Sequence, residues 1–132
     1  MFVDASALIA MLTDEGDARI FAARLQSHPK RMTSPIAVFE ASASVARTLG
    51  LRVEESELAL RKFLELMGIQ VVSLPVQVVP MAIEALGRFG RGAGHPAGLN
   101  TGDCLAYACA RYYRVPLLYK GPKFAATDIE AA

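Results

Sequence analysis

Short β-prone segments that alternate with longer helical segments are the feature that most limits how this chain folds. The strand candidates are residues 2–4, 31–33, 69–74 and 115–119, and the helix candidates are residues 5–12, 18–27, 36–49, 53–67, 75–89 and 101–114. Such alternation is typical of a parallel sheet covered by helices on both faces. The sequence therefore predicts an α/β fold, a three-layer α/β/α sandwich with a central parallel sheet of about four to five strands.

Cap residues mark several of the predicted helix boundaries. Ser34 and Pro35 have the order of an N-cap followed by a first helical residue, and Gly50 stands where that helical pattern stops. Asn100 is the predicted N-cap of the last helix, with Asp103 as its third residue. The amphipathic helix over residues 53–67 and the helix before it are candidate surfaces for a partner.

Length and composition indicate one globular domain over residues 1–132. Hydrophobic residues make up 53% of the chain and charged residues 20%. Asp4 interrupts the apolar N-terminus, and no apolar run is long enough to span a bilayer. We therefore expect a cytoplasmic protein with no membrane partner. Cys104 and Cys109 point in different directions on one predicted helix, so we expect no disulfide between them.

The charge of the chain is uneven although its net value is only +1. Residues 1–84 hold eight basic and ten acidic side chains, whereas residues 85–125 hold six basic side chains against Asp103 alone. A basic C-terminal third could attract a polyanion such as nucleic acid. The alternative is that these charges only solvate a helix face and a loop.

Three acids stand near predicted strand ends or helix starts. Asp4 follows the first strand, Glu40 lies one to two turns into the helix after the second strand, and Asp103 opens a late helix. In a parallel sheet the carboxyl ends of the strands meet at one edge, where ligands bind. Clustered carboxylates repel one another unless a hard cation such as Mg²⁺ or Mn²⁺ lies among them. We therefore expect a metal site that activates a water for attack on a phosphate.

Each acid also has a purely structural explanation. Asp4 or Ser6 could cap the first helix, and Asp103 could close a capping box. Glu40 has small or apolar neighbours at three and four residues, but it could pair with Arg47 at seven residues along the same helix.

In combination, these residues resemble the PIN domain of VapC-type toxins over essentially the whole chain. The matching segments are Phe-Val-Asp4-Ala-Ser6-Ala-Leu, Ser34-Pro35 through Glu40, His95-Pro-Ala-Gly-Leu-Asn100-Thr-Gly-Asp103-Cys-Leu-Ala-Tyr107, and Leu-Leu-Tyr-Lys120-Gly121 followed by Phe124-Ala-Ala-Thr127-Asp128-Ile. The resemblance implies a magnesium-dependent endoribonuclease, the toxin of a type II toxin–antitoxin system, that forms homodimers and is silenced by a VapB-like antitoxin.

The resemblance also implies roles for individual residues. Asp4 and Asp103 would be the principal metal-site acids and Glu40 the third catalytic acid. Supporting residues would be Ser6, Asn100, Thr127 and Asp128. Mn²⁺ is expected to substitute for Mg²⁺.

One position departs from the family pattern. Many members carry a further acid in a Gly-x-Asp-Phe segment, and here that segment is Gly121-Pro122-Lys123-Phe124. Either Asp128 partly compensates for the missing acid, or the metal binds weakly and needs the substrate phosphate to complete its shell. A different interpretation is an RNA-binding or protein-interaction module with weak or no nuclease activity. A third is a metal-dependent phosphatase that acts on small molecules.

Overall fold

The computed structural model describes all 132 residues and contains four short strands and six α-helices. The strands are β1 (Phe2–Val3), β2 (Met32–Thr33), β3 (Gln70–Val71) and β4 (Leu117–Leu118). The α-helices are α1 (Ala5–Leu12), α2 (Ala18–Ser27), α3 (Pro35–Leu49), α4 (Val53–Leu66), α5 (Val78–Phe89) and α6 (Thr101–Tyr113). Two 3₁₀ turns, η1 (Arg91–Ala93) and η2 (Phe124–Ala126), complete the chain. No helix is both long and apolar enough to cross a membrane.

The four strands form one parallel sheet in the order β3-β2-β1-β4. Phe2 is in register with both Met32 of β2 and Leu117 of β4, and Thr33 is in register with Val71 of β3. β1 is therefore an inner strand, and its carboxyl end lies between the ends of β2 and β4. The prediction of a central parallel sheet is confirmed.

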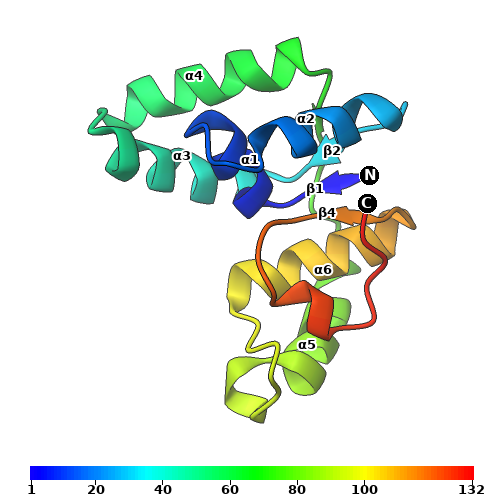
Figure 1. Cartoon of the computed structure of the whole chain (residues 1–132). Coiled ribbons are helices and arrows are strands. Elements are labelled where there is room, and N and C mark those ends of the chain that lie inside the picture. The colour runs from blue at the N-terminus through cyan, green and yellow to red at the C-terminus, as the bar shows by residue number, and fades with distance from the viewer.

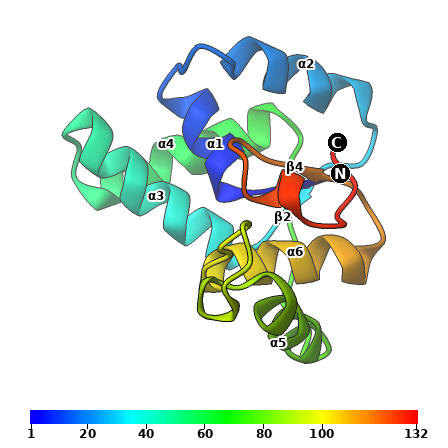
Figure 2. The same ribbon diagram turned by 60° about the horizontal axis from the view of Figure 1, so that its bottom comes forward.

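Helices cover both faces of the sheet, as Figures 1 and 2 show. α1 to α4 form one layer, and α6 and α5 form the other, with α6 next to the sheet. Alternation along the strands divides the core in two: Phe2 and Leu117 pack with α5 and α6, whereas Val3 and Leu118 pack with the first layer. The predicted three-layer arrangement is confirmed.

Local sequence explains where the helices begin and end. The Ser34 hydroxyl accepts a hydrogen bond from the Ala37 N–H at 3.1 Å, and Gly50 ends α3 in the left-handed conformation with φ 66°. Pro80 is the third residue of α5, within the first turn, where a backbone N–H has no helical partner to lose.

The strands are shorter than the sequence predicts. The segments predicted at 69–74 and 115–119 each contain only two strand residues, because regular pairing ends where a neighbouring strand turns into its helix. The segment after β4 is more ordered than the predicted polar tail. Leu117 pairs with Ala131, so the C-terminus runs beside β4 at the edge of the sheet.

Leu60 offers a test of this core. Its side chain is fully buried in the cluster that joins α4 to α1, α2 and α3 within the first layer. Leu60→Ala is expected to lower the free energy of unfolding by about 2–5 kcal/mol, because it leaves a cavity. Leu66, on the same helix, is 83% exposed. Leu66→Ala should therefore change stability by no more than about 0.5 kcal/mol in the same urea titration. Equal effects of the two substitutions would contradict the packing described here.

Candidate active site

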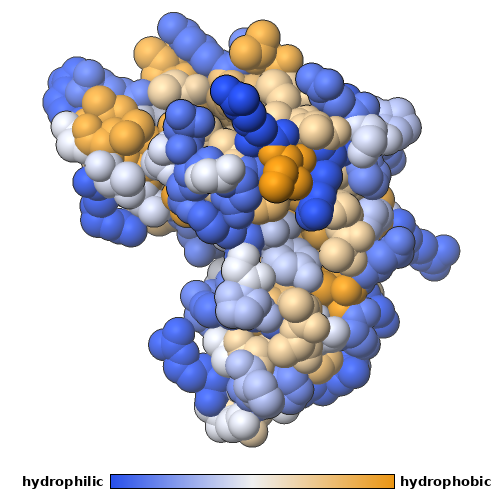
Figure 3. All heavy atoms as spheres, in the orientation of Figure 1, coloured by the Kyte–Doolittle hydropathy of each residue, from blue (hydrophilic) through white to orange (hydrophobic).

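A groove at the carboxyl edge of the sheet gathers the three acids that the sequence singles out. It has a volume of about 420 Å³ and is lined by residues from α1, α3 and the start of α6: Asp4, Ala5, Ser6, Ile9, Phe39, Glu40, Ala43, Ser44, Arg47 and Asp103. We call it the acid groove. Figure 3 shows the surface hollowed at the left, between the layer of α1 to α4 and the layer of α5 and α6.

Asp4 is held rigidly at the junction of β1 and α1. Its backbone N–H donates to Leu118 O at 2.9 Å, which continues the β1–β4 pairing by one residue. Its carboxylate is the N-cap of α1 and accepts hydrogen bonds from the Ser6 N–H at 3.0 Å and the Ser6 hydroxyl at 2.5 Å. The capping explanation is thus correct, and the same carboxylate also lines the groove.

Ser6 ties Asp4 to the chain after β4. While its hydroxyl donates to Asp4, the same oxygen accepts a hydrogen bond from the Lys120 N–H at 3.0 Å. The Lys120 ammonium forms ion pairs with Glu15 and, at 3.4 Å, with Asp17, both in the segment between α1 and α2. The structure therefore brings Ser6 to Asp4, where the resemblance implies a supporting residue.

Glu40 approaches the groove from α3 and lies against the first turn of α6. A Cβ atom at Gly102 would lie only 2.4–2.7 Å from the Glu40 carboxyl group. Glycine at position 102 therefore leaves the space that the Glu40 carboxylate fills. Glu40 makes no ion pair with Arg47, although both side chains line the groove, so the predicted alternative of a Glu40–Arg47 pair is not formed.

Asp103 closes the capping box that the sequence predicts. The Asn100 side-chain oxygen accepts a hydrogen bond from the Asp103 N–H at 2.8 Å, and Asp103 Oδ2 accepts one from the Asn100 N–H at 3.0 Å. The box fixes the carboxylate at the positive end of α6, beside the groove. Asn100 therefore supports Asp103 by holding it in place through the two hydrogen bonds of the capping box.

Lys123 is a cation that contacts one of the three acids, Asp103. Its ammonium donates to Asp103 Oδ2 at 3.1 Å. The residue that stands at the usual acid position of the family motif is thus adjacent to the acid groove. The sequence identified the substitution, but it did not indicate which carboxylate the ammonium would contact.

Burial and mutual repulsion perturb two of the carboxyl groups. Burial raises the pKa of Asp4 above its ordinary value of 3.8; the Ser6 hydrogen bonds oppose the rise, and the Asp103 carboxylate adds to it. Burial also raises the pKa of Glu40 above 4.5, with further contributions from Asp4 and Asp103. The negative charges of these carboxylates, which come from three distant segments, therefore repel one another, and a cation among them would relieve the repulsion.

The donor set suits a hard divalent cation, but the acids do not meet at a single point. All three side chains offer carboxylate oxygens, which Mg²⁺ and Mn²⁺ prefer. No group of three His, Cys, Asp or Glu side chains lies close enough to hold one ion. In this conformation Asp4 is bonded to Ser6 and Asp103 to Lys123.

Two supporting residues implied by the resemblance lie outside the groove. The Asp128 carboxylate accepts a hydrogen bond from the Tyr107 hydroxyl at 2.5 Å and pairs with Arg88 at 3.3 Å, and these contacts lower its pKa. It lines a separate hollow with Arg111 and Arg114. The hypothesis that Asp128 compensates for the missing acid therefore lacks support from the structure, because its charge is already engaged.

Thr127 has a local role instead. Its hydroxyl donates to Phe124 O at 2.6 Å and accepts from the Ile129 N–H at 3.2 Å, which caps η2. The cysteines are as expected: Cys104 and Cys109 are buried and form no disulfide.

Comparisons with known proteins agree with this architecture. The family model described as "PIN domain" matches residues 1–130. The chain is 37% identical to ribonuclease VapC28 of Mycobacterium tuberculosis, with 100% of this chain and 97% of the relative covered. It is 39% identical to ribonuclease VapC42 of the same organism, with 100% and 98% covered, and 34% identical to a VapC ribonuclease of Rhizobium meliloti, with 97% and 98% covered.

Two solved structures share the fold at low sequence identity. The crystal structure of Mycobacterium tuberculosis VapC20, described as a sarcin-ricin loop cleaving toxin, matches with a TM-score of 0.77 and 17% identity over 99% of this chain and 97% of that one. A toxin–antitoxin complex from Klebsiella pneumoniae matches with a TM-score of 0.69 and 17% identity over 96% and 92%.

The raised pKa of Asp4 predicts a pH-dependent stability difference. An acid whose pKa is higher in the folded state destabilises that state when ionised, so its penalty is present at pH 7–8 and disappears as the pH falls toward 3.8. In metal-free protein, Asp4→Asn keeps a good N-cap and should raise the free energy of unfolding at pH 8. The gain should shrink toward pH 4 in urea titrations. Asp14→Asn, an exposed change outside the groove, is the control. A gain that does not vary with pH would contradict this electrostatic picture.

Proposed function

The chain belongs to the PIN-domain family and is similar to VapC ribonucleases along its whole length, and from this we propose that it is a metal-dependent endoribonuclease, the toxin of a type II toxin–antitoxin pair. The single observation that best supports the proposal is the acid groove. Asp4, Glu40 and Asp103 come from three distant parts of the sequence and line one hollow at the carboxyl edge of the sheet. Hydrolysis of an RNA phosphodiester in the cytoplasm is the activity that we assign.

The residues divide the chemistry among them. We propose that Asp4 and Asp103 hold Mg²⁺, for which Mn²⁺ can substitute, and that the bound ion supplies a Lewis acid and an activated water. Ser6 keeps Asp4 oriented, and the Asn100 box keeps Asp103 oriented. We propose that Glu40, whose pKa is raised, accepts a proton from the attacking water as the water oxygen forms a new bond to phosphorus. The P–O bond to the leaving ribose oxygen breaks, and that oxygen takes a proton from solvent.

Basic side chains support RNA as the substrate. The exposed side chain of Arg47 lines the acid groove, and Lys123 contacts Asp103. Arg111 in the last turn of α6 and Arg114, its C-cap, line a separate hollow with Asp128. Cations spread over such a distance favour an extended polyanion over a small phosphate ester, so we prefer a ribonuclease to the phosphatase interpretation.

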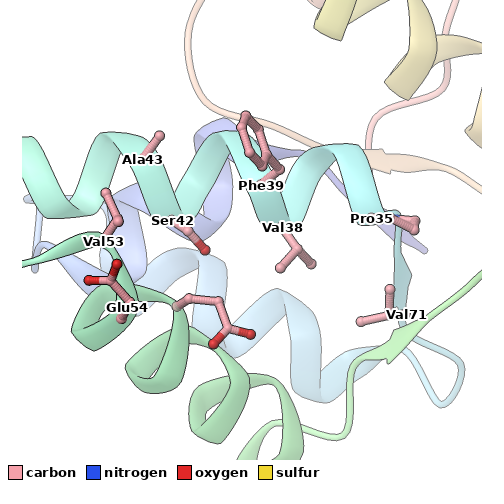
Figure 4. Close-up of a pocket in the computed structure, with 9 residues that line it drawn as sticks. Pro35, Val38, Phe39, Ser42, Ala43, Val53, Glu54 and Val71 are labelled. Atoms are coloured by element: carbon pink, nitrogen blue, oxygen red, sulfur yellow. The ribbon is translucent and has the colours of Figure 1, made fainter.

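A second, apolar groove supports an antitoxin partner. It lies between α3 and α4, has a volume of about 690 Å³, and is lined by Pro35, Val38, Phe39, Ser42, Ala43, Val53, Glu54, Glu57 and Val71 (Figure 4). Phe39 and Ala43 also line the acid groove, so the two hollows are adjacent. We propose that a VapB-like antitoxin places an apolar segment here and extends a basic side chain toward Asp4 and Glu40.

An exposed apolar face on α5 supports a homodimer. Val79, Ile83 and Leu86 are 54%, 62% and 45% exposed and follow one another at spacings of four and three residues. This is the spacing with which one helix packs along another. We propose that a second copy of the chain covers this face, which is separate from the groove between α3 and α4.

Cleavage of RNA tests the proposed site. Asp103→Asn is expected to lower the rate of RNA cleavage in Mg²⁺ by at least about 100-fold, because it removes a charge that holds the ion. Asp128→Asn is the matched control and should cleave at nearly the wild-type rate, since Asp128 lies outside the groove. Gel analysis of a total-RNA digest measures both, and circular dichroism checks the fold. Retained activity in Asp103→Asn would refute the site, whereas RNA binding without cleavage by the wild type would favour a binding module.

Phe39 tests the partner surface. Its ring is 75% exposed between the two grooves. Phe39→Ala is expected to weaken binding of the cognate antitoxin by about 30-fold, because exposed aromatic side chains often dominate interfaces. Leu66→Ala removes an equally exposed apolar side chain of α4 that lines neither groove, and it should bind normally. Calorimetry with the cognate antitoxin measures both; equal affinities for the two variants would place the partner elsewhere.

A further inference from the structure

We propose that Lys123 is a tethered cation that occupies Asp103 in the metal-free protein and competes with the divalent ion for that carboxylate. The proposal rests on the proposed function, since it assumes that Asp103 is a metal ligand. It adds a property of this particular chain: the occupancy of the metal site is set by an internal ammonium as well as by the acids.

The contact between Lys123 and Asp103 is direct and partly shielded from solvent. The ammonium lies 3.1 Å from Asp103 Oδ2, and the Asp103 side chain is only 15% exposed. The same oxygen accepts the Asn100 N–H, whereas Oδ1 accepts no hydrogen bond. Asp103 thus already has a cation and a backbone donor before any metal arrives.

The backbone around Lys123 is fixed, so the ammonium stays near the groove. Phe124, the next residue, is buried and packs against the Tyr119 ring with the ring centres 5.2 Å apart. Thr127 caps the 3₁₀ turn that follows. Because the backbone is anchored, the Lys123 ammonium has a high effective concentration beside Asp103. The Lys123 side chain is 41% exposed, so it can also move into solvent when another cation binds Asp103.

No other ion pair reaches the acids of the groove. Lys120, three residues before Lys123, pairs with Glu15 and Asp17 instead. The remaining ion pairs of the molecule join Arg52 to Glu55, Arg61 to Glu57, and Arg88 to Glu84 and Asp128. Lys123 is therefore positioned as the one internal competitor for a metal at Asp103.

Competition follows from the charges. A divalent ion that approaches Asp103 meets the ammonium within a few ångströms, where like charges in a partly buried site repel strongly. The ion binds fully only when Lys123 leaves Oδ2. In the structure, in which Lys123 contacts Asp103, the three acids do not lie close enough to share one ion.

Isothermal calorimetry with Mn²⁺ tests the inference without any RNA. Lys123→Met keeps the length of the side chain and removes its charge, and it should bind Mn²⁺ about tenfold more tightly than the wild type. Lys123→Asp should bind at least as tightly as Lys123→Met. Lys120→Met is the matched control, because the side chain that it alters pairs with Glu15 and Asp17 rather than with a groove acid. The substitution keeps the backbone N–H that donates to Ser6, so the Mn²⁺ affinity should stay within about twofold of the wild type.

The outcomes separate this inference from the proposed function. If the wild type binds Mn²⁺ and Lys123→Met binds it no more tightly, the competition is refuted while the metal site stands. If Lys120→Met tightens binding as much as Lys123→Met, the effect is general electrostatics and the specific role of Lys123 is refuted. If neither the wild type nor any variant binds Mn²⁺, the competition is refuted, and the cleavage assay of Asp103→Asn in Mg²⁺ then decides the proposed function separately.

Discussion

The hydrogen bonding of the buried Asp4 carboxylate to Ser6 is the interaction on which the rest of the site depends. It ends the inner strand β1, caps α1 through Ser6, and is linked through the Ser6 hydroxyl to the backbone after β4. One short hydrogen-bonded chain therefore joins two strand ends and a helix start. Because parallel strands present their carboxyl ends at one edge, this junction also decides where the other acids can meet it.

Placing Asp4, Glu40 and Asp103 close together causes electrostatic repulsion that no contact in the fold fully offsets. Burial and like charges raise the pKa of both Asp4 and Glu40, so the groove is poised for a cation. In this chain the cation already present is the Lys123 ammonium at Asp103. The same negative charge that suits a metal thus also attracts a side chain of the protein, and the balance between the two is a property of the sequence around Lys123.

Neither groove contains a residue of the exposed face of α5, so a partner in the grooves and a partner on that face would contact different residues. The apolar groove between α3 and α4 adjoins the acid groove along Phe39 and Ala43, so one extended partner segment can reach both. The exposed residues of α5 belong to the opposite layer of the sandwich. The antitoxin and the second copy proposed above would therefore contact different parts of the molecule.

The sequence by itself determined the parallel α/β fold, the capping of α3 and α6, and the three acids, because periodicity, cap chemistry and strand–helix order are local signals. Tertiary structure decided the rest. Strand lengths depend on where neighbouring strands stop pairing, and the ion pairs of Lys123 and Asp128 join residues 20 and 40 positions apart in sequence. Glycine is needed at position 102 only because the Glu40 carboxylate, which belongs to another helix, fills the space that a Cβ atom there would occupy. Such contacts depend on how the layers dock, which no local pattern encodes.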